Sequence, residues 1–356
     1  MSRKTLIIAE AGVNHDGDFD AAVALVDAAA DAGADVVKFQ TFSADKLASR
    51  KAEKAAYQKV ATGAGESQRD MLRRLELGHD AHRRLVKHAA ERGIGFLSTP
   101  FDLESLAFLS DDLRLPQLKL GSGEVTNAPL LVAVGRTGRP VVLSTGMANL
   151  GEVELALAAL AVGYLGREPN RAAFARALSD AAAWEALRRN VTLLQCTTQY
   201  PAPAADANLG AMATLRAAFG LPVGYSDHCL GINVSLAAAA LGAVAIEKHF
   251  TLDRTRPGPD HAASLEPGEL KQLVDGVREI SASLGDGLKT PRASEVPNIP
   301  VARKSIVAAR PIARGERLTL DAITTKRPGD GRSPFDIWDL VGTEATADYD
   351  EDDAIR

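Results

Sequence analysis

The sequence is poor in cysteine and in long apolar runs, and both shortages exclude whole classes of protein. Two cysteines occur in 356 residues, Cys196 and Cys229, and they form no C-x-x-C pair. A disulfide scaffold is therefore not expected, and a reducing, cytoplasmic location is favoured. No apolar stretch reaches the roughly 20 residues that span a bilayer, and the start of the chain lacks the pattern of a signal peptide. We expect a protein without a membrane partner.

Positive charge is not in excess either. The chain has 41 Lys and Arg against 46 Asp and Glu, which gives a formal net charge of -5. It therefore has no bulk positive field that would hold nucleic acid. An anionic substrate must then be captured by a few placed lysines. The remaining composition, 46% hydrophobic and 24% charged, is that of a globular protein.

Short apolar, β-branched runs alternate eight times with helical patterns. The expected strands are 5–10, 36–42, 95–101, 117–124, 140–146, 191–201, 222–228 and 243–251. Between them, apolar positions recur every three or four residues, as in 18–32 and 80–92, where Asp18 and Asp80 suit the N-cap. Nearly continuous apolar strands that alternate with helices predict a parallel sheet. Eight such units predict a (β/α)8 TIM barrel. An open doubly wound sheet is the alternative, but no G-x-G-x-x-G follows the first strand.

The chain is expected to divide into two domains. Residues 1–285 form the barrel, whose last helix is expected at 266–284. The proline-containing stretch 286–300 is typical of a linker, and 301–356 form a small, mostly β domain. The strands expected in that domain are Ser305–Ala308 and Arg317–Leu320.

Two segments exceed what a minimal barrel needs. Residues 43–79 are polar and mixed in charge, which favours a lid or a substrate loop. Residues 163–190 are rich in Ala and Arg with helical spacing, and we expect them to extend the fifth helix and its loop at the surface.

Polar side chains gather where the predicted strands end. In a TIM barrel the active site lies at the C-terminal ends of the strands, so these side chains are the candidates. They are Glu10, Lys38, Gln40, Thr99, Lys119, Ser122, Glu124, Ser144, Thr198, Tyr200, Ser226, His228 and His249. Alternation along the strands places Lys38 on one face with Gln40 and points Lys119 into the barrel. Two lysines beside hydroxyls and the Gly-Ser-Gly backbone at 121–123 would make a phosphate cradle.

Two histidines end the last two strands, which are neighbours in a barrel. His228 and His249 can meet at one ion beside the carboxylate of Glu10. The alternation points Cys229 away from this site, so thiolate ligation is not expected. Two imidazoles with oxygen donors favour Mn²⁺ or Mg²⁺ over a closed zinc site.

The motifs taken together resemble the sialic acid synthase family. They are IAEAGVNHDGD (8–18), GADVVKFQTF (33–42), FLSTPFD (96–102), LKLGSGEVTN (118–127), STGMA (144–148), CTTQYPAP (196–203), VGYSDH (223–228), IEKHFTLD (246–253) and GPDHAASLEP (258–267). The C-terminal stretch 302–346, with KRPGDGRSP (326–334), resembles the family's antifreeze-like (SAF) domain. The resemblance covers nearly the whole chain.

The resemblance implies that phosphoenolpyruvate condenses with an open-chain N-acyl-mannosamine-type aldehyde. The products would be a nine-carbon sugar acid of the neuraminate or legionaminate class and phosphate. His228 and His249 match the ligands of a divalent metal, usually Mn²⁺, with Mg²⁺ or Co²⁺ as alternatives. The metal would polarise the aldehyde oxygen. Glu10 and Glu124 match carboxylates that stabilise a cation at carbon 2, and Glu10 would also orient or deprotonate a water.

The same resemblance implies the substrate contacts. Those to phosphoenolpyruvate match Lys38, Thr99, Lys119, Ser122, Ser144 and Ser226. Gln40 and Thr198 are further substrate-binding candidates, although some relatives carry Asn or Ser at position 198. Tyr200 and Asp260 match contacts to the amino sugar. Arg327 matches an arginine that completes the neighbouring subunit's site, which implies a domain-swapped homodimer.

Three other functions remain open at this point. A pseudaminate synthase would use a related sugar. A Schiff-base aldolase or lyase on the same barrel would use Lys38, Lys119 or Lys248 as the amine nucleophile. A non-catalytic carbohydrate-binding or ice-binding role would rest on residues 301–356 alone.

Overall fold

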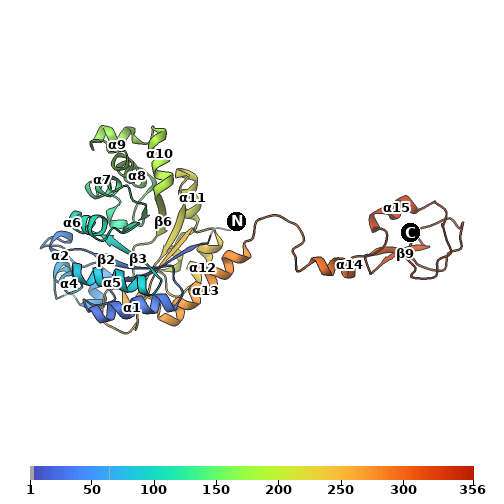
Figure 1. Cartoon of the computed structure of the whole chain (residues 1–356), viewed down its shortest axis with the longest axis horizontal. Helices are drawn as coiled ribbons and strands as arrows, with labels where there is room; N and C mark the ends of the chain where they lie inside the picture. Colours follow the sequence, from blue (N-terminus) through green and yellow to red (C-terminus); the bar gives the residue numbers. More distant parts are fainter. Residues whose placement is uncertain (1–3, 64) are drawn as a thin grey trace. The chain divides into compact units, whose positions relative to one another are not determined.

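The computed structural model describes residues 4–63 and 65–356, which fold into two compact units. The first unit ends at Asp286, and the second runs over Gly287–Arg356. In Figure 1 the first unit is coloured from blue to orange and the second is mostly red.

The first unit is a barrel of parallel strands. Its strands are β1 (Leu6–Gly12), β2 (Val36–Thr41), β3 (Gly95–Pro100), β4 (Leu118–Leu120), β5 (Val141–Ser144), β6 (Val191–Cys196), β7 (Val223–Asp227) and β8 (Ala245–His249). In the described part of the chain they form one eight-stranded sheet in the order β3-β2-β1-β8-β7-β6-β5-β4, and every paired neighbour is parallel. β3 and β4, at the two ends of this order, contact each other and close the barrel. The predicted (β/α)8 fold is confirmed, and the open doubly wound sheet is wrong.

Helices cover the outside of this barrel (Figure 1). The helices of the first unit are α1 (Phe19–Asp31), α2 (Ala44–Leu47), α3 (Ala56–Thr62), α4 (Gln68–Arg74), α5 (His79–Glu91), α6 (Leu103–Ala107), α7 (Ala128–Arg136), α8 (Leu150–Tyr164), α9 (Arg171–Ala177), α10 (Ala181–Asn190), α11 (Gly210–Phe219), α12 (Asn233–Ala240) and α13 (Pro267–Ser283). Strand alternation explains the layering: Val37 and Phe39 of β2 belong to the main apolar core with Leu25 and Leu85, while Lys38 faces inward.

The expected helix starts are half right. Asp18 caps α1, since its carboxylate accepts hydrogen bonds from the backbone of Asp20 at 2.8 Å and of Ala21 at 3.4 Å. Asp80 is not a cap: Gly78 is the N-cap of α5, and Asp80 lies in the first turn, where a carboxylate still complements the helix dipole.

Most predicted strands are a few residues too long, and two of them exceed their observed C-terminal ends the most. β4 ends at Leu120 because Gly121 is followed by a 3-10 turn over Ser122–Glu124. β6 ends at Cys196, and the residues up to the cis Tyr200–Pro201 peptide form a loop. Glu124, Thr198 and Tyr200 therefore lie in loops, so strand alternation does not govern where their side chains point.

The two long segments also fold differently from the expectation. Among its described residues, 43–79 contains three short helices, α2, α3 and α4, rather than an open loop. In 163–190 the fifth helix is not extended, because α8 ends at Tyr164 and two separate helices follow. Gly166, with a φ of +62°, adopts the left-handed conformation that suits a helix end.

The second unit is built around an antiparallel pair of strands. β9 (Ser305–Ala308) has the predicted bounds, and its partner is β10 (Ile323–Lys326). The expected strand at Arg317–Leu320 is wrong, because Arg317 makes an isolated bridge to Glu344 instead. Short helices precede and follow the pair, namely α14 (Ile299–Ala302) and α15 (Ile337–Leu340). A separate apolar core supports this unit, formed by Ile306, Ala308, Ile312, Leu318, Ala322, Ile323, Leu340, Ala345, Tyr349 and Ile355.

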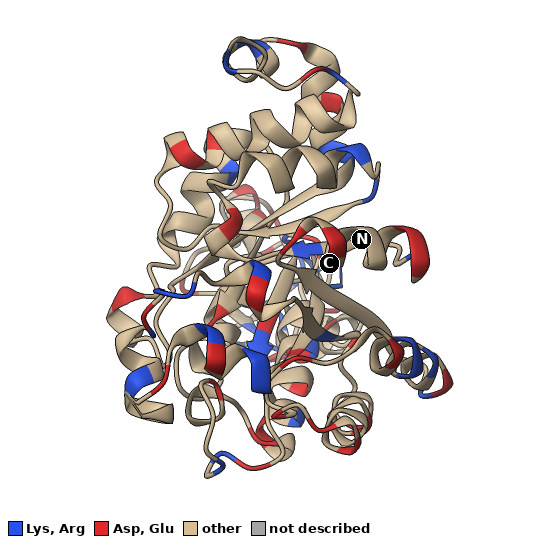
Figure 2. Cartoon of the chain, turned by 90° about the vertical axis from the view of Figure 1, so that its left-hand side faces the viewer, with Lys and Arg blue, Asp and Glu red and all other residues tan. Residues whose placement is uncertain are grey.

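The surface carries charge of both signs. Acidic and basic residues are interspersed over the helices in the view of Figure 2. A search of the described residues finds no helix with the length and hydropathy needed to cross a bilayer.

Candidate active site

A pocket of about 160 Å³ opens at the C-terminal ends of the barrel strands. It is lined by Glu10, Lys38, Gln40, Thr99, Phe101, Lys119, Gly121, Ser122, Gly123, Ser144, Cys196, Thr198, Tyr200, Ser226, His228, Glu247 and His249. Every predicted candidate lines this pocket except Glu124, Asp260 and Arg327. The barrel thus collects residues that are up to 239 positions apart in the chain, since Glu10 and His249 are paired on neighbouring strands.

Two buried lysines stand on one side of the pocket. Lys38 lies 2.8 Å from a carboxylate oxygen of Glu10 and donates to the Thr99 hydroxyl at 3.3 Å. Lys119 donates to the Ser144 hydroxyl at 2.7 Å. Their side chains are 4% and 2% exposed, so both ammonium groups are held away from bulk water. Such groups bind anions strongly because water does not screen them.

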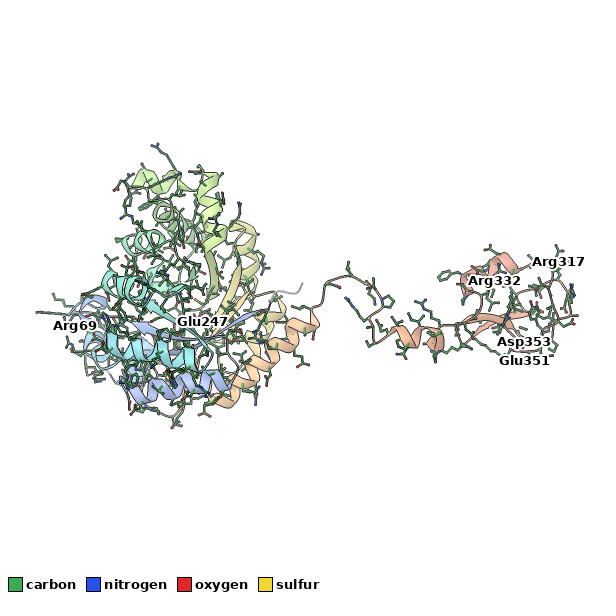
Figure 3. All side chains as sticks on the ribbon, in the orientation of Figure 1. Arg69, Glu247, Arg317, Arg332, Glu351 and Asp353 are labelled. Atoms are coloured by element: carbon green, nitrogen blue, oxygen red, sulfur yellow. The ribbon has the colours of Figure 1, made fainter. Side chains whose placement is uncertain are left out.

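Glu247, which the sequence reasoning missed, lies between these lysines. Its carboxylate is 3.7 Å from the Lys38 ammonium and 3.6 Å from that of Lys119, and it accepts a hydrogen bond from Ser226 at 2.8 Å. Figure 3 shows Glu247 inside the barrel. The signal was present, because Glu247 stands two residues before His249 on β8 and so shares its face.

The buried charges of the pocket shift one another's pKa values. Burial raises the pKa of Glu10 to about 7, against the opposing effect of Lys38. The pKa of Glu247 is lowered instead, since Lys119 and Lys38 together outweigh its burial. Burial lowers the pKa of Lys119, whereas the pKa of Lys38 is raised because two carboxylates outweigh the effect of burial. Glu247 is therefore the permanent anion of the group, and Glu10 is the one poised to exchange a proton.

Hydroxyl, thiol and backbone groups form the wall beside Lys119. The Ser122 hydroxyl lies 3.1 Å from the Cys196 sulfur and accepts a hydrogen bond from the Gly146 backbone at 2.9 Å. A Cβ at Gly146 would meet Cys196 and Ser122 at 2.9 Å each, so this close approach requires glycine. Within the described residues the buried Thr198 hydroxyl has no hydrogen-bond partner, which leaves it for a ligand.

The two predicted histidines lie side by side in the pocket, at the ends of neighbouring strands. Their ring centroids are 5.5 Å apart, and the Tyr200 ring lies 4.1 Å from His228 and 5.6 Å from His249. Burial lowers the pKa of His228 to about 4, so the ring is neutral near pH 7. Its Nδ1 lies 2.6 Å from the carbonyl oxygen of Thr197 and must donate there, which leaves Nε2 as an electron-pair donor.

The residues fit an open metal site with two imidazole ligands. Nδ1 of His249 is buried and has no hydrogen-bond partner among the described residues, and burial together with His228 lowers the pKa of this ring. Gly12, with a φ of +55°, makes room for the ring, because a Cβ there would come within 3.3 Å of it. A search of the residues that the structure describes finds no group of three or more His, Cys, Asp or Glu that could hold a metal. Substrate or water would therefore have to supply the other ligands.

Lys248 points to the other side of β8. Its ammonium lies 3.0 Å from the carboxylate of Asp227 and donates to the carbonyl of Cys229, and both charged side chains are buried. Asp227 also accepts a hydrogen bond from Ser235 on α12 at 2.6 Å. Lys248 is therefore a structural residue and not an amine in the pocket.

Three candidates lie outside the pocket lining. Glu124 accepts a hydrogen bond from Asn127 at 2.6 Å, and burial raises its pKa. Asp260 is buried, its carboxylate lies 3.7 Å from Nδ1 of His249, and burial raises its pKa to about 6. It thus borders the histidine side of the pocket. Arg327 is exposed in the second unit, directly after β10.

A second pocket of about 380 Å³ offers fewer groups that could bind or activate a substrate. It is lined by Asp16, Thr62, Met71, Arg74, Leu75, Arg256, Pro257, Gly258 and Pro259. Its two arginines are already neutralised, since Arg74 pairs with Glu66 and Arg256 lies 2.8 Å from Asp16. The barrel-mouth pocket is therefore the candidate active site.

Comparison with known proteins identifies the family of the chain. The model of the NeuB family matches residues 25–289, and that of the SAF domain matches 303–356. The chain is 49% identical to an N,N'-diacetyllegionaminic acid synthase of Campylobacter jejuni over 99% of both proteins, and 43% identical to one of Legionella pneumophila over 96% of this chain and 90% of that one. A crystal structure of N-acetylneuraminic acid synthetase from Leptospira borgpetersenii in complex with citrate matches with a TM-score of 0.67 and 33% identity, over 84% of this chain and 91% of that one. The chain belongs to the NeuB family and carries a SAF domain at its C-terminal end.

Proposed function

We propose that the chain condenses phosphoenolpyruvate with an N-acyl-mannosamine-type sugar to give a nine-carbon sugar acid of the legionaminate class and phosphate. The observation that carries this proposal is the pairing, in one pocket, of two buried lysines with two neutral imidazoles. The relatives named as N,N'-diacetyllegionaminic acid synthases support the choice of sugar acid. A neuraminate or pseudaminate product is the alternative within the same chemistry.

The lysine side would bind the donor substrate. Phosphoenolpyruvate carries a phosphate and a carboxylate, and Lys38 and Lys119 supply ammonium groups for them. The further donors on this side are the hydroxyls of Thr99, Ser122, Ser144, Thr198 and Ser226, the amide of Gln40 and the backbone of 121–123. Glu247 would keep both lysines charged and in place before the anion arrives.

The histidine side would bind a divalent metal, Mn²⁺ by preference, with Mg²⁺ or Co²⁺ as alternatives. Nε2 of His228 and the ring of His249 would hold it, and the unpartnered Nδ1 of His249 supports this assignment. When bound, the metal supplies a Lewis acid for the aldehyde oxygen of the sugar. Tyr200 and Asp260, which border this side, would position the sugar.

Glu10 would act as the base that takes a proton from the attacking water. The double-bond electrons of phosphoenolpyruvate form the new carbon–carbon bond to the aldehyde carbon, whose oxygen takes up a proton. Carbon 2 is then electron-poor, and water adds to it while Glu10 takes a proton from that water. The bond from carbon 2 to the phosphate oxygen breaks last while the new hydroxyl on carbon 2 gives its proton to the departing phosphate, which leaves the keto group and inorganic phosphate. A pKa of about 7 suits Glu10 for this role.

A phosphate-release assay with candidate sugars tests the function. With phosphoenolpyruvate, Mn²⁺ and a 2,4-diacetamido-6-deoxy sugar of mannosamine type, we expect one phosphate per sugar acid. N-acetylmannosamine should be used less well. Faster turnover of N-acetylmannosamine would assign the chain to neuraminate synthesis, and trapping of pyruvate by borohydride would favour a Schiff-base aldolase instead.

We also propose a homodimer in which Arg327 completes the partner's site. In the second unit Phe335 and Trp338 are 89% and 70% exposed, and an apolar surface of this kind suits burial against another subunit. Mixing two inactive variants, His249→Ala and Arg327→Ala, tests the exchange. If the arginine acts across subunits, mixed dimers contain one intact site and regain activity. No recovery in mixed dimers would show that each chain uses its own arginine.

The proposed location is the cytoplasm. Both cysteines are free and buried, and Cys196 lines the active-site pocket. A reduced thiol at that position suits a reducing compartment.

A further inference from the structure

The segment 43–79 brings a tyrosine to the edge of the active-site pocket. Tyr57, in the first turn of α3, lies 5.1 Å from Tyr200 between ring centroids, with the planes inclined by 35°. Tyr200 in turn stacks beside His228 at 4.1 Å. A continuous series of rings therefore runs from α3 to the histidine side of the pocket.

Asp260 borders the same side of the pocket, since its carboxylate lies 3.7 Å from Nδ1 of His249, whose ring centroid is 5.6 Å from that of Tyr200. Its carboxylate adds to the effect of burial in raising the pKa of both the Tyr57 and the Tyr200 phenols. The two hydroxyls therefore stay protonated near pH 7. This side of the pocket thus offers two aromatic faces, two hydroxyl donors and one carboxylate acceptor. An N-acylated sugar is complementary to such a site, because its C–H and methyl groups can pack on the rings and its hydroxyl and amide groups can form hydrogen bonds.

A buried lysine fixes the helix that carries Tyr57. The Lys54 side chain is 0% exposed, and its ammonium donates to the Thr62 hydroxyl and the Gly63 carbonyl at 2.9 Å each. It also donates to Glu66 at 2.8 Å, and Glu66 accepts from Arg74 on α4 at 2.7 Å. Lys54 thereby ties the C-terminal end of α3 to the start of α4, and it contacts no residue that lines the active-site pocket in these interactions.

We propose that Tyr57 binds the acceptor sugar together with Tyr200 and Asp260, and that Lys54 is a positioning residue that holds α3 in place for it. This inference rests on the proposed function, because it assigns the sugar end of the same site. It gives the segment 43–79 a defined role in choosing the acceptor. The donor end, with Lys38 and Lys119, lies outside this role.

Steady-state kinetics with each substrate varied in turn test the role of Tyr57. We expect Tyr57→Ala to raise the KM for the sugar about tenfold or more, while the KM for phosphoenolpyruvate changes less than about twofold. Tyr57→Phe keeps the ring and should lie between the wild type and Tyr57→Ala. An unchanged sugar KM in Tyr57→Ala, or an equal rise in both KM values, would overturn the assignment.

A charge-matched pair of variants tests Lys54. Lys54→Met should raise the sugar KM about fivefold at a nearly constant phosphoenolpyruvate KM. Lys59→Met is the control, because Lys59 lies on α3 itself but is 41% exposed and pairs with Glu53 at the surface. Glu66→Gln turns the ion pair of Lys54 into a weaker, neutral hydrogen bond and serves if Lys54→Met does not fold. A lower Tm with an unchanged sugar KM in these variants would contradict a positioning role.

Turnover by the wild type distinguishes an error in the proposed function from an error in the roles of Tyr57 and Lys54. If the wild type releases no phosphate with any N-acyl-mannosamine-type sugar, the proposed function is wrong and the inference falls with it. If the wild type turns over and the Tyr57 and Lys54 variants keep its sugar KM, the inference alone is wrong.

Discussion

Glu247 shows how a single residue can hold two buried lysines together in one pocket. Two lysines buried side by side would repel each other, and burial alone would favour their neutral forms. The carboxylate lies within 3.7 Å of both and removes most of that cost. Because Ser226 donates to it, the carboxylate also has a fixed orientation.

The first prediction concerns this carboxylate. Glu247→Gln keeps the shape but removes the charge, so the lysines lose a shared partner and the pKa of Lys119, which burial already lowers, falls further. We expect kcat/KM for phosphoenolpyruvate to fall by about 10- to 100-fold, or about 1.4 to 3 kcal/mol. The KM for the sugar should change little. Unchanged use of phosphoenolpyruvate would show that Glu247 has no part in anion binding.

The second prediction concerns the imidazoles. In the proposed metal site the protein supplies only two ligands, so EDTA should abolish turnover and added Mn²⁺ should restore it in the wild type. His249→Ala should lose one of two protein ligands and stay inactive at the Mn²⁺ concentration that restores the wild type. Metal content by mass spectrometry after gel filtration is the direct measurement. A variant that binds Mn²⁺ as tightly as the wild type would remove His249 from the site.

Among the elements, helices α7 and α8 pack with their backbones almost in contact. A Cβ at Gly163 would come within 2.9 Å of the Gly135 Cα, and one at Gly135 would meet the Gly163 Cα at the same distance. Neither glycine has a positive φ, so the requirement is for space and not for backbone conformation.

The third prediction follows from this contact. Gly163→Ala should force the helices apart and lower the free energy of unfolding by about 1 to 3 kcal/mol. Urea unfolding followed by circular dichroism measures the loss. Gly166→Ala, where an added Cβ has open space but φ is +62°, separates crowding from conformational strain. A Gly163→Ala variant as stable as the wild type would mean that the two helices can move apart freely.

The elements also show what the sequence could predict. The alternation of apolar runs and helical spacing was enough for the barrel, because β1, β4, β5, β7 and β8 are buried along all or nearly all of their length. Strand ends were misjudged at Gly121 and after Cys196, where tertiary contacts and not local pattern decide between strand and loop. Loop residues such as Glu124 then escape any argument from alternation.

The site was predictable to the extent that strand geometry determines it. Lys38 and Lys119 lie on regular strands, and alternation placed them in the pocket, while His249 was placed there by its position at the end of the last strand. Tyr57 could not be found in this way, because it comes from a helix in a long connection whose position depends on packing and on the buried Lys54.

At the scale of the whole molecule, buried neutral histidines make the barrel sensitive to acid. His15 is 1% exposed, accepts a hydrogen bond from the Gly17 backbone at 3.0 Å, and has its pKa lowered to about 3 by burial and by His82. The unfolded chain binds a proton at His15 near pH 6.5, whereas the folded chain does not until about pH 3. The stability that this group contributes is therefore complete above pH 6.5 and is lost as the pH falls from 6.5 towards 3.

The fourth prediction uses that window. Between pH 6 and pH 4 the free energy of unfolding should fall by about 1.4 kcal/mol per pH unit for this histidine. His15→Asn keeps an acceptor for the Gly17 backbone but cannot titrate, so its Tm should depend less steeply on pH over this range. Calorimetry of both proteins at several pH values gives the comparison. Parallel Tm profiles would mean that His15 is not neutral in the folded barrel.

The buried pair of Lys248 and Asp227 has a consequence for how the last strand can assemble. Charged side chains alternate in direction along β8. Glu247 and His249 point into the barrel, and Lys248 points to the helix side. A shift of β8 by one residue would turn the Lys248 ammonium into the barrel. It would also bury the Glu247 carboxylate and the His249 imidazole among apolar helices. The buried charges therefore disfavour any other register of β8. A one-residue deletion in the connection before Ala245 should prevent the chain from folding, so that its loss of activity reflects misfolding and not a slower reaction.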